Sequence, residues 1–436
     1  MVVTKKKGIK LRKTRKKLKN MSDVKPEIVT IKGYKILLLP NKNNTINIKA
    51  YINNGFITET KETSGINHLL EHVLFSAWKK CNNKPCDQLF WHNGITGNAT
   101  TSDNILTYYI EGLNDKIDML LEYIITITTK PYITKDLLEA EKTPVLNEEL
   151  ILKNNRVTNL WDLLAKNLYS KEGLKYMYDS ENHIKNLKKL DLKKIREVFN
   201  KYYTPNNIIY TVSGDYNKNK LLGIFKKFLP KNKYNKSIIN RDCFNKNRKK
   251  LLFDKDKTAK TGTILYVFPV ELYRGDKNLL KLYVAISSLN HLLHKTLRYK
   301  YKVTYSIHIN INTTACGTLI TIKTNSQCKN IKKIYKILDS EIEKYKREGI
   351  SEKLLFSEKK LYLYNYINNY NNPHTLADFY GYNYIHQINN NIVKLHSIKE
   401  AKNIILDTTV DEIKNLFKLV FNKSKAVKAY QCSTRE

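Results

Sequence analysis

Long apolar runs, cysteine, proline and arginine are all scarce in this sequence. No apolar stretch approaches the roughly 20 residues of a membrane-spanning helix, and no signal-peptide core follows the N-terminus. The six cysteines, at positions 81, 86, 243, 316, 328 and 432, match neither a disulfide framework nor a four-thiolate zinc pattern. We therefore predict reduced thiols in an intracellular protein that has no membrane span and resides in the cytoplasm.

Acidic residues are few beside the basic ones, 40 against 77, which gives a formal net charge of +37. Such an excess usually indicates a polyanionic partner. Only 10 of the 77 basic residues are arginine, however, and arginine reads phosphates and guanines best. Lysine instead accompanies heavy use of asparagine, isoleucine and tyrosine, a mixture typical of AT-rich coding sequence. Nucleic-acid binding is therefore an alternative and not the predicted main function.

The chain is long enough for two domains with separate cores. Residues 1–25 form a basic tail that cannot pack, and we predict that it is disordered. Residues 26–229 and 251–436 each contain predicted strands and helices, which indicates an internal duplication. The polar, basic segment 230–250 between them is interpreted as a linker. The predicted fold class is therefore α+β.

The segment from Gly65 to Phe75 contains the pattern His-x-x-Glu-His, formed by His68, Glu71 and His72. On a helix the two histidines lie one turn apart on one face, and the glutamate reaches the same side. Two such imidazoles can bind one Zn²⁺, and the carboxylate beside them can take a proton from metal-bound water. This is the zinc-protease motif His-Glu-x-x-His in reverse order.

The alternative to a metal site is a surface helix with two solvated histidines. The motif is surrounded by leucine, valine and phenylalanine, which indicates a mostly buried helix. Unpaired histidines and a glutamate would be costly in that setting, so the metal site is favoured. Either Ser64 or Asn67 is expected to cap the helix.

Two further segments are candidates for the same site. The helix expected from Thr134 to Leu152 carries four glutamates, which usually form a solvated face, but the zinc still lacks a third protein ligand. Residues 93–103 are small and polar and precede a strand, so another backbone can approach them closely. A simple turn and edge strand is the alternative for this second segment.

In their order and spacing these motifs resemble the pitrilysin or insulinase family of zinc peptidases, which includes the mitochondrial processing peptidases. The match runs from about Ile28 to the last strands. In the family a glutamate ligand follows the motif by roughly 76 residues, which selects Glu148 (148 − 72 = 76), and a second glutamate precedes it by seven, which selects Glu141. A Gly-Ser-x-x-Glu-like segment of the family is matched by Gly55 to Glu59, with Phe56 in place of the serine. The remaining matches are Gly65, His68, Glu71, His72, Phe75, Asn98, Ala99, Thr101, Asp103, Tyr108, Tyr109, Leu297, Arg298 and Tyr305.

The resemblance implies a zinc-dependent metalloendopeptidase that hydrolyses peptides or unfolded polypeptides. His68, His72 and Glu148 would bind one Zn²⁺ per chain, Glu71 would act as general base on the activated water, and Glu141 would orient a ligand histidine. Pro144 departs from the family pattern. If it kinks and rotates the helix, Glu149 replaces Glu148 as the third ligand.

The resemblance also implies how the substrate binds. A substrate strand would add to the edge formed by Asn98, Ala99 and Thr101, while Arg298 and Tyr305 would grip its carbonyl group.

Family members of this length form one half of a clamshell, with a mostly antiparallel, helix-covered sheet in each domain, and the arginine and tyrosine come from the opposite half. We therefore predict a homodimer, with a heterodimer of related subunits as the alternative. A catalytically inactive partner subunit is the first functional alternative. The composition resembles a large-DNA-virus or other AT-rich version of the family, so a virion-associated location is one alternative to the cytoplasm. A mitochondrial location is another, because the basic tail could be a presequence.

Overall fold

The computed structural model describes residues 25–81, 86–231, 243–370, 372–388 and 395–435. The predicted basic tail therefore lies outside the described residues except for Lys25. Residues 232–242 of the predicted linker also lie outside them.

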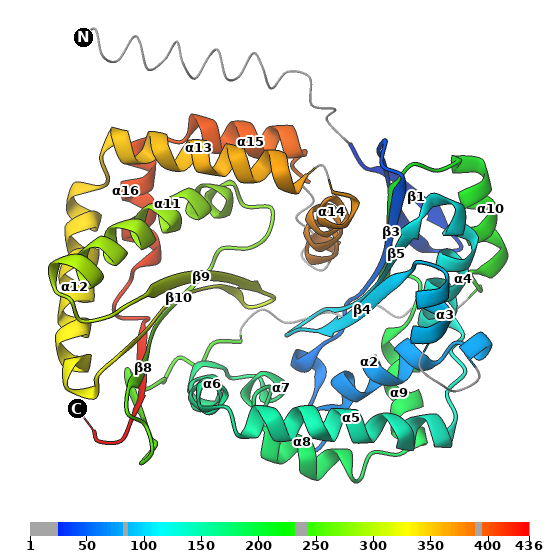
Figure 1. Cartoon of the computed structure of the whole chain (residues 1–436), viewed down its shortest axis with the longest axis horizontal. Helices are drawn as coiled ribbons and strands as arrows, with labels where there is room; N and C mark the ends of the chain where they lie inside the picture. The colour runs from blue at the N-terminus through cyan, green and yellow to red at the C-terminus, as the bar shows by residue number, and fades with distance from the viewer. Residues whose placement is uncertain (1–24, 82–85, 232–242, 371, 389–394, 436) are drawn as a thin grey trace, which may run out of the picture.

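The first half of the chain builds a six-stranded sheet in the order β1-β2-β6-β3-β5-β4 (Figure 1). Lys32 and Gly33, both at positive φ, close the hairpin between β1 and β2. Every pair of neighbouring strands is antiparallel except β2 and β6. The strands are β1 (Glu27–Ile31), β2 (Tyr34–Pro40), β3 (Thr45–Ile52), β4 (Thr96–Thr101), β5 (Leu106–Leu113) and β6 (Ile208–Gly214).

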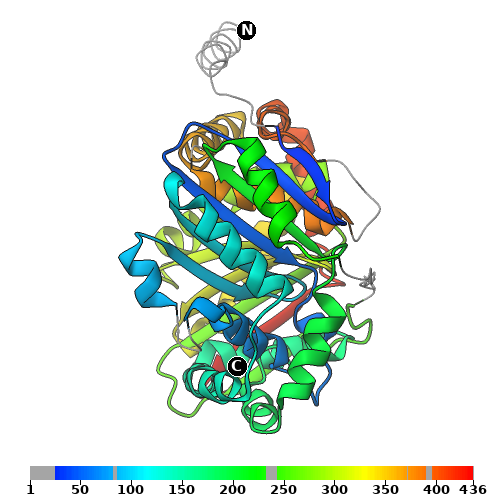
Figure 2. The same ribbon diagram turned by 90° about the vertical axis from the view of Figure 1, so that its right-hand side faces the viewer.

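Amphipathic helices of the same half cover one face of this sheet, as the view from its side shows (Figure 2). Leu120, Leu121 and Ile124 of α4 belong to one buried cluster with Ile48 and Ile110 of the strands. Burying this apolar stripe is what holds the helices on the sheet. The helices of this half are α2 (Ile66–Ser76), α3 (Asp87–His92), α4 (Ile117–Thr129), α5 (Lys135–Lys153), α6 (Arg156–Leu168), α7 (Glu172–Lys175), α8 (Ser180–Leu187), α9 (Leu192–Tyr202) and α10 (Lys218–Phe228).

The second half builds a five-stranded sheet in the order β7-β11-β8-β10-β9, and its own helices again cover one face. The strands are β7 (Leu251–Lys255), β8 (Gly262–Val270), β9 (Ile307–Thr314), β10 (Gly317–Ser326) and β11 (Val427–Cys432). The helices are α11 (Lys277–His294), α12 (Ile331–Glu348), α13 (Glu352–Asn369), α14 (Pro373–Ile388), α15 (Ile398–Asp407) and α16 (Val410–Val420). Two sheets with helical covers confirm the predicted α+β class and its two related halves.

Each half also lends one helix to the sheet of the other. Helix α6 packs on the uncovered face of the second sheet, where Leu164 joins Leu265 and Val427 in one buried cluster. Helix α14 packs in the same way on the first sheet, where Tyr380 joins Leu37. Helices α6 and α14 thus pack across the predicted domain boundaries at residues 229 and 251. The boundaries themselves remain a prediction.

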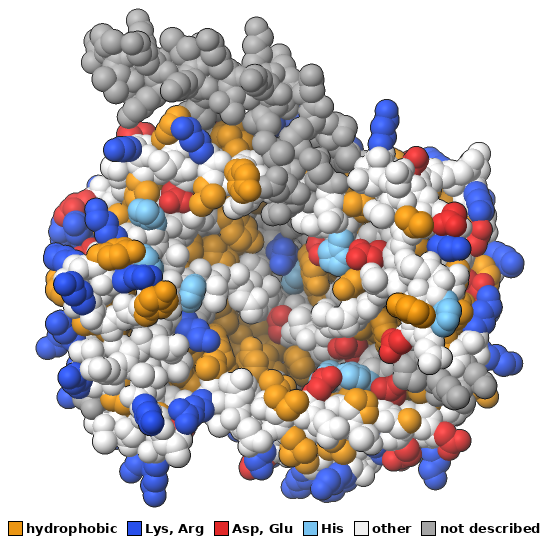
Figure 3. Space-filling view, viewed as in Figure 1, with side chains coloured by type: hydrophobic (Ala, Val, Ile, Leu, Met, Phe, Trp, Pro, Cys, Tyr) orange, Lys and Arg blue, Asp and Glu red, His pale blue; other side chains and the backbone are white. Residues whose placement is uncertain are grey.

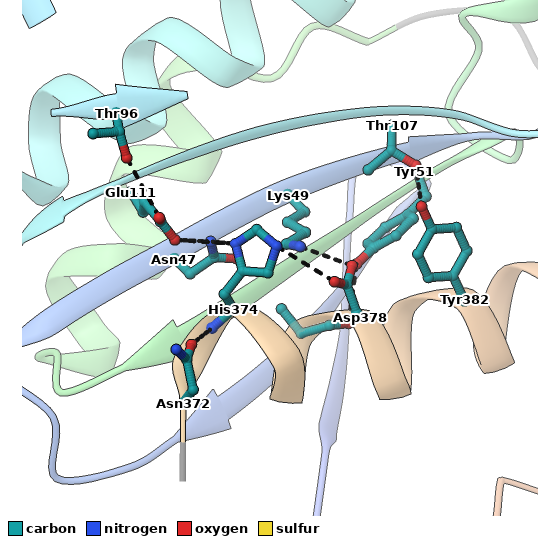
Figure 4. A network of polar contacts seen from close by, with 11 residues as sticks. Asn47, Lys49, Tyr51, Thr96, Thr107, Glu111, Asn372, His374, Asp378 and Tyr382 are labelled. Atoms are coloured by element: carbon teal, nitrogen blue, oxygen red, sulfur yellow. Dashed lines mark hydrogen bonds and ion pairs between the residues drawn. The ribbon is translucent and has the colours of Figure 1, made fainter. Parts of the chain in front are cut away.

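A polar network fastens α14 to the first sheet (Figure 4). The Lys49 ammonium lies 2.7 Å from an oxygen of Asp378, and burial lowers the pKa of Lys49 although this carboxylate opposes the effect. His374 lies between Glu111, 3.1 Å from its Nδ1, and Asp378, 3.5 Å from its Nε2. Gly381 permits the close approach, since a Cβ there would lie 2.2 Å from the ring of Tyr51.

The prediction of reduced thiols is wrong for this structure, in which the six cysteines form three disulfides. The pairs are Cys81–Cys86, Cys243–Cys316 and Cys328–Cys432. Their Cα atoms are 5.3, 5.5 and 6.0 Å apart, within the usual range for a disulfide. Two pairs join segments 73 and 104 residues apart, a proximity that only the fold creates.

Within the described part of the chain, every helix is too short or too polar to span a lipid bilayer.

The exchanged helix α6 makes a first testable prediction. We expect Leu164→Ala to lower the free energy of unfolding by about 2–5 kcal/mol, because Leu164 is fully buried between α6 and the second sheet. Urea unfolding followed by circular dichroism measures the loss. Leu361→Ala is the control, because Leu361 is 50% exposed on α13. Equal losses in the two variants would contradict the packing described for α6.

Candidate metal centre

Helix α2 carries the His-x-x-Glu-His motif and begins where a buried carboxylate satisfies its first N–H groups. Glu59 accepts hydrogen bonds from the backbone N–H of Gly65 and of Asn67, both at 2.9 Å. Gly65 precedes the helix in the left-handed conformation, at φ 91°. The expectation that Ser64 or Asn67 caps the helix is wrong, because Glu59 provides the acceptor from outside the helix.

The two histidines of α2 point their Nε2 atoms at one carboxylate oxygen of α5. Glu148 Oε2 lies 3.2 Å from His68 Nε2 and 3.7 Å from His72 Nε2. The three donor atoms all lie within 4.8 Å of one another. Tetrahedral ligands about 2.0–2.1 Å from a zinc ion stand roughly 3.3 Å apart. The residues therefore fit a zinc ion held by two imidazoles and one carboxylate.

Each of the two histidines also has a buried carboxylate near its other ring nitrogen. Glu141 Oε2 lies 3.7 Å from His72 Nδ1, and the second oxygen of Glu141 accepts a hydrogen bond from Ser76 Oγ at 2.7 Å. Glu149 Oε1 lies 3.6 Å from His68 Nδ1. Helix α5 runs through Pro144, and it is Glu148 that faces the Nε2 atoms of the two histidines.

Glu71 lies between α2 and strand β4. Its Oε2 accepts a hydrogen bond from Thr101 Oγ1 at 2.6 Å, and the residue is 8% exposed. Burial raises the pKa of Glu71, although Thr101 and the two histidines of the motif partly offset that effect. A carboxylate whose pKa lies above its ordinary value is a better proton acceptor for catalysis near neutral pH.

These groups line a cavity of about 760 Å³ that opens between α2, α5 and β4. β4 is one of the two edge strands of its sheet. The predicted substrate residues Asn98, Ala99 and Thr101 lie on it and line the cavity with Glu71 and Glu148. In the space-filling view a hollow opens in the middle of the molecule, with acidic and histidine side chains on its right-hand wall (Figure 3).

Arg298 and Tyr305 contact one another but are absent from the described residues that line this cavity. The Arg298 guanidinium lies 4.2 Å from the centre of the Tyr305 ring, a cation–π contact. Arg298 lies on a π-helical segment, Lys295–Lys300, and Tyr305 is 76% exposed. The structure therefore brings the zinc-motif residues and the β4 residues together and leaves this pair on the surface of the second half.

Sequence reasoning missed Glu59 and His183, which support the site from outside the motif. His183 lies on α8, where its Nδ1 is 2.9 Å from Glu149 Oε1. A lone histidine on an amphipathic helix carries no spacing signal that could have revealed this contact. Glu59 was matched only as part of a segment from Gly55, without a role.

Comparison with known families identifies the family of the chain. The model described as Insulinase (Peptidase family M16) matches residues 35–179, and the model described as Peptidase M16 inactive domain matches residues 189–362. The chain belongs to the insulinase family. The predicted family resemblance is thereby confirmed for both halves.

Individual members of the insulinase family are distant in sequence but alike in fold. The chain is 28% identical over 207 residues to Zinc protease PqqE of Helicobacter pylori, a match that covers 47% of this chain and 46% of that protein. The chain thus spans less than half the length of that relative. It is 22% identical over 334 residues to Uncharacterized zinc protease YmxG of Bacillus subtilis, covering 75% of this chain and 80% of that one. The crystal structure of a protease from Helicobacter pylori superimposes with a TM-score of 0.79 at 19% identity, over 94% of this chain and 99% of that one.

The burial of Glu59 makes a prediction about pH. Burial raises the pKa of Glu59 from 4.5 to about 7, so the folded chain keeps a proton that the unfolded chain has lost. Stability should therefore fall as the pH rises from about 4.5 to about 7, and stay level above that. The full change is on the order of 3 kcal/mol, and Glu59→Gln should remove it.

Urea unfolding of the chelator-treated proteins from about pH 5 to about pH 8 measures the slope. Glu139→Gln, at an exposed glutamate of α5, should keep the wild-type slope. An unchanged slope in Glu59→Gln would show that Glu59 does not titrate in this range.

Proposed function

We propose that this chain is a zinc-dependent metalloendopeptidase that hydrolyses peptides or unfolded polypeptides. The observation that carries the proposal is the convergence of His68 Nε2, His72 Nε2 and Glu148 Oε2, with Glu71 beside them in the same cavity. Membership of a peptidase family and relatives named zinc proteases support it. The cofactor proposed is one Zn²⁺ per chain.

When bound, zinc supplies a Lewis acid that polarises a carbonyl and lowers the pKa of a coordinated water. His68, His72 and Glu148 would hold the ion. Glu71 would accept the proton of the attacking water and then pass it to the leaving amine. Its hydrogen bond to Thr101 fixes the carboxylate between helix and strand at the wall of the cavity.

The edge of β4 is the proposed site for the substrate backbone. Asn98, Ala99 and Thr101 lie on this edge strand and line the cavity. An extended peptide can add to such an edge through main-chain hydrogen bonds, without a demand on its sequence. This arrangement favours unfolded substrates, because a folded domain rarely offers an unpaired strand.

Metal content and cleavage test the proposal together. The wild-type protein should carry about one zinc per chain, and His68→Ala and Glu148→Gln should lose it. Glu71→Gln should keep zinc and cleave a fluorogenic peptide at least about a hundredfold more slowly, because it lacks the general base. Glu139→Gln is the matched control and should resemble the wild type in both measurements.

An inactive partner subunit is the second candidate, and the match of residues 189–362 to an inactive-domain model favours it. It predicts a well-folded wild type that fails to cleave denatured proteins whether or not zinc is present. Peptide cleavage that disappears in Glu71→Gln would exclude it.

We also infer that each site is completed by a second copy of the chain. Arg298 and Tyr305 would be supplied by the partner to grip the substrate carbonyl and the developing oxyanion. Their contact with one another, the exposure of Tyr305 and their absence from the described cavity wall support this inference. A heterodimer with a related subunit is the alternative.

Mixing two inactive variants tests completion by the partner. Glu71→Gln and Arg298→Ala should each be inactive as homodimers, yet their mixed dimer keeps one site with both residues intact. A 1:1 mixture allowed to exchange subunits should recover about a quarter of wild-type peptidase activity, because half of the dimers are mixed and each has one working site.

The control mixture combines Glu71→Gln with His68→Ala, which damage the same half and should recover nothing. Size-exclusion chromatography with light scattering gives the mass of the active species. A monomer that cleaves peptides, or recovery in the control mixture, would contradict the inference.

A further inference from the structure

A buried acid–imidazole pair lies behind the candidate ligand His68. Glu149 belongs to α5 and His183 to α8, and both side chains are 3% exposed. His183 Nδ1 donates a hydrogen bond to Glu149 Oε1 at 2.9 Å, and the same oxygen lies 3.6 Å from His68 Nδ1. One carboxylate oxygen thus faces a ring nitrogen from each of two other helices.

The position of His183 is fixed by its surroundings. Its ring lies parallel to that of Phe56, with centroids 6.2 Å apart and an angle of 2° between the planes. It also lies against Gly65, where a Cβ would be 3.4 Å from the His183 ring. Neither Glu149 Oε2 nor His183 Nε2 has a hydrogen-bond partner in the described part of the chain. The hydrogen bond between the two side chains therefore helps to orient both.

We propose that Glu149 and His183 form a positioning pair that holds His68 ready to bind the metal. A histidine can offer Nε2 to a metal when its Nδ1 keeps the proton and donates it to an acceptor. Glu149 Oε1, 3.6 Å from His68 Nδ1, would be that acceptor, and the hydrogen bond with His183 would keep its carboxylate from swinging toward the metal. The inference rests on the proposed function, because it assigns His68 as a zinc ligand.

The pair also accounts for the choice between two adjacent glutamates. Glu148 is half exposed and reaches the Nε2 atoms, whereas Glu149 is buried, lies near Nδ1 of His68 and is occupied by His183. His72 has a comparable acceptor in Glu141, which is anchored by a serine. His68 is thus the ligand whose orientation depends on a contact with α8.

The test measures metal affinity and metal geometry, and does not depend on peptidase activity. Zinc dissociation constants are determined by competition with a fluorescent chelator for the wild type, Glu149→Gln, His183→Gln and the double variant. Glu149→Gln should bind zinc about tenfold to a hundredfold more weakly. The visible absorption spectrum of the Co²⁺-loaded proteins should shift in the same variants, because a turned His68 changes the ligand field.

The double variant distinguishes positioning through Glu149 from a separate effect of His183. If His183 acts through Glu149, the double variant should bind zinc no more weakly than Glu149→Gln alone. Glu139→Gln, on the same helix and exposed, should match the wild type. Should Glu149→Gln fail to fold by circular dichroism, His183→Gln provides the same comparison with the carboxylate still present.

Zinc affinity within about threefold of wild type and an unchanged Co²⁺ spectrum, in folded Glu149→Gln or His183→Gln, would overturn the proposal. A wild type that binds zinc tightly but cleaves nothing would end the peptidase proposal and leave this one standing. A folded wild type that binds no zinc would end both.

Discussion

The contact between helices α2 and α5 is the constraint on which the rest of the site depends. Helix α2 is buried against the first sheet, so its histidines and glutamate need partners. Those partners come from α5, where Glu141 and Glu148 stand two turns apart and Glu149 directly follows Glu148. Together with Glu71, four carboxylates surround two imidazoles in a protein whose formal net charge is +37. Such a local excess of negative charge is a strong electrostatic reason for a divalent cation to bind there.

The sheet edge and the metal cluster are parts of one structure. Thr101 belongs to β4, and its hydroxyl binds the carboxylate that would serve as general base. A substrate that lengthens the sheet at β4 would therefore lie beside Glu71 without any movement of the helix. Two further residues support the site. Glu59 accepts hydrogen bonds from the first turn of α2, and His183 on α8 contacts Glu149 behind the ring of His68.

Much of this could be predicted from the sequence, because the decisive signals are local. Each of these signals lies within one helix, one strand or a short stretch of sequence. They are the spacing of His68, Glu71 and His72, the alternation of strands and helices, and the small residues of β4. What could not be read are contacts between distant segments. The acceptor role of Glu59, the contact of His183 with Glu149 and the pairing of Cys328 with Cys432 all depend on how elements stack. The packing of α6 and α14 on the sheet of the other half could not be predicted for the same reason. The sequence of an amphipathic helix shows which face is buried, but not which sheet it packs against.

That exchange has a consequence for how the chain acquires its shape during synthesis. The first sheet is complete once β6 ends at Gly214, but the helix that seals its second face begins only at Pro373, 159 residues later (373 − 214). At ribosomal speeds of about 5–20 residues per second, that face stays open for roughly 8–32 s. Leu37, Leu39 and Tyr51, which α14 buries in the folded chain, lie on that face. Folding of the first half before the second is made would therefore leave an apolar sheet face uncovered until α14 is available.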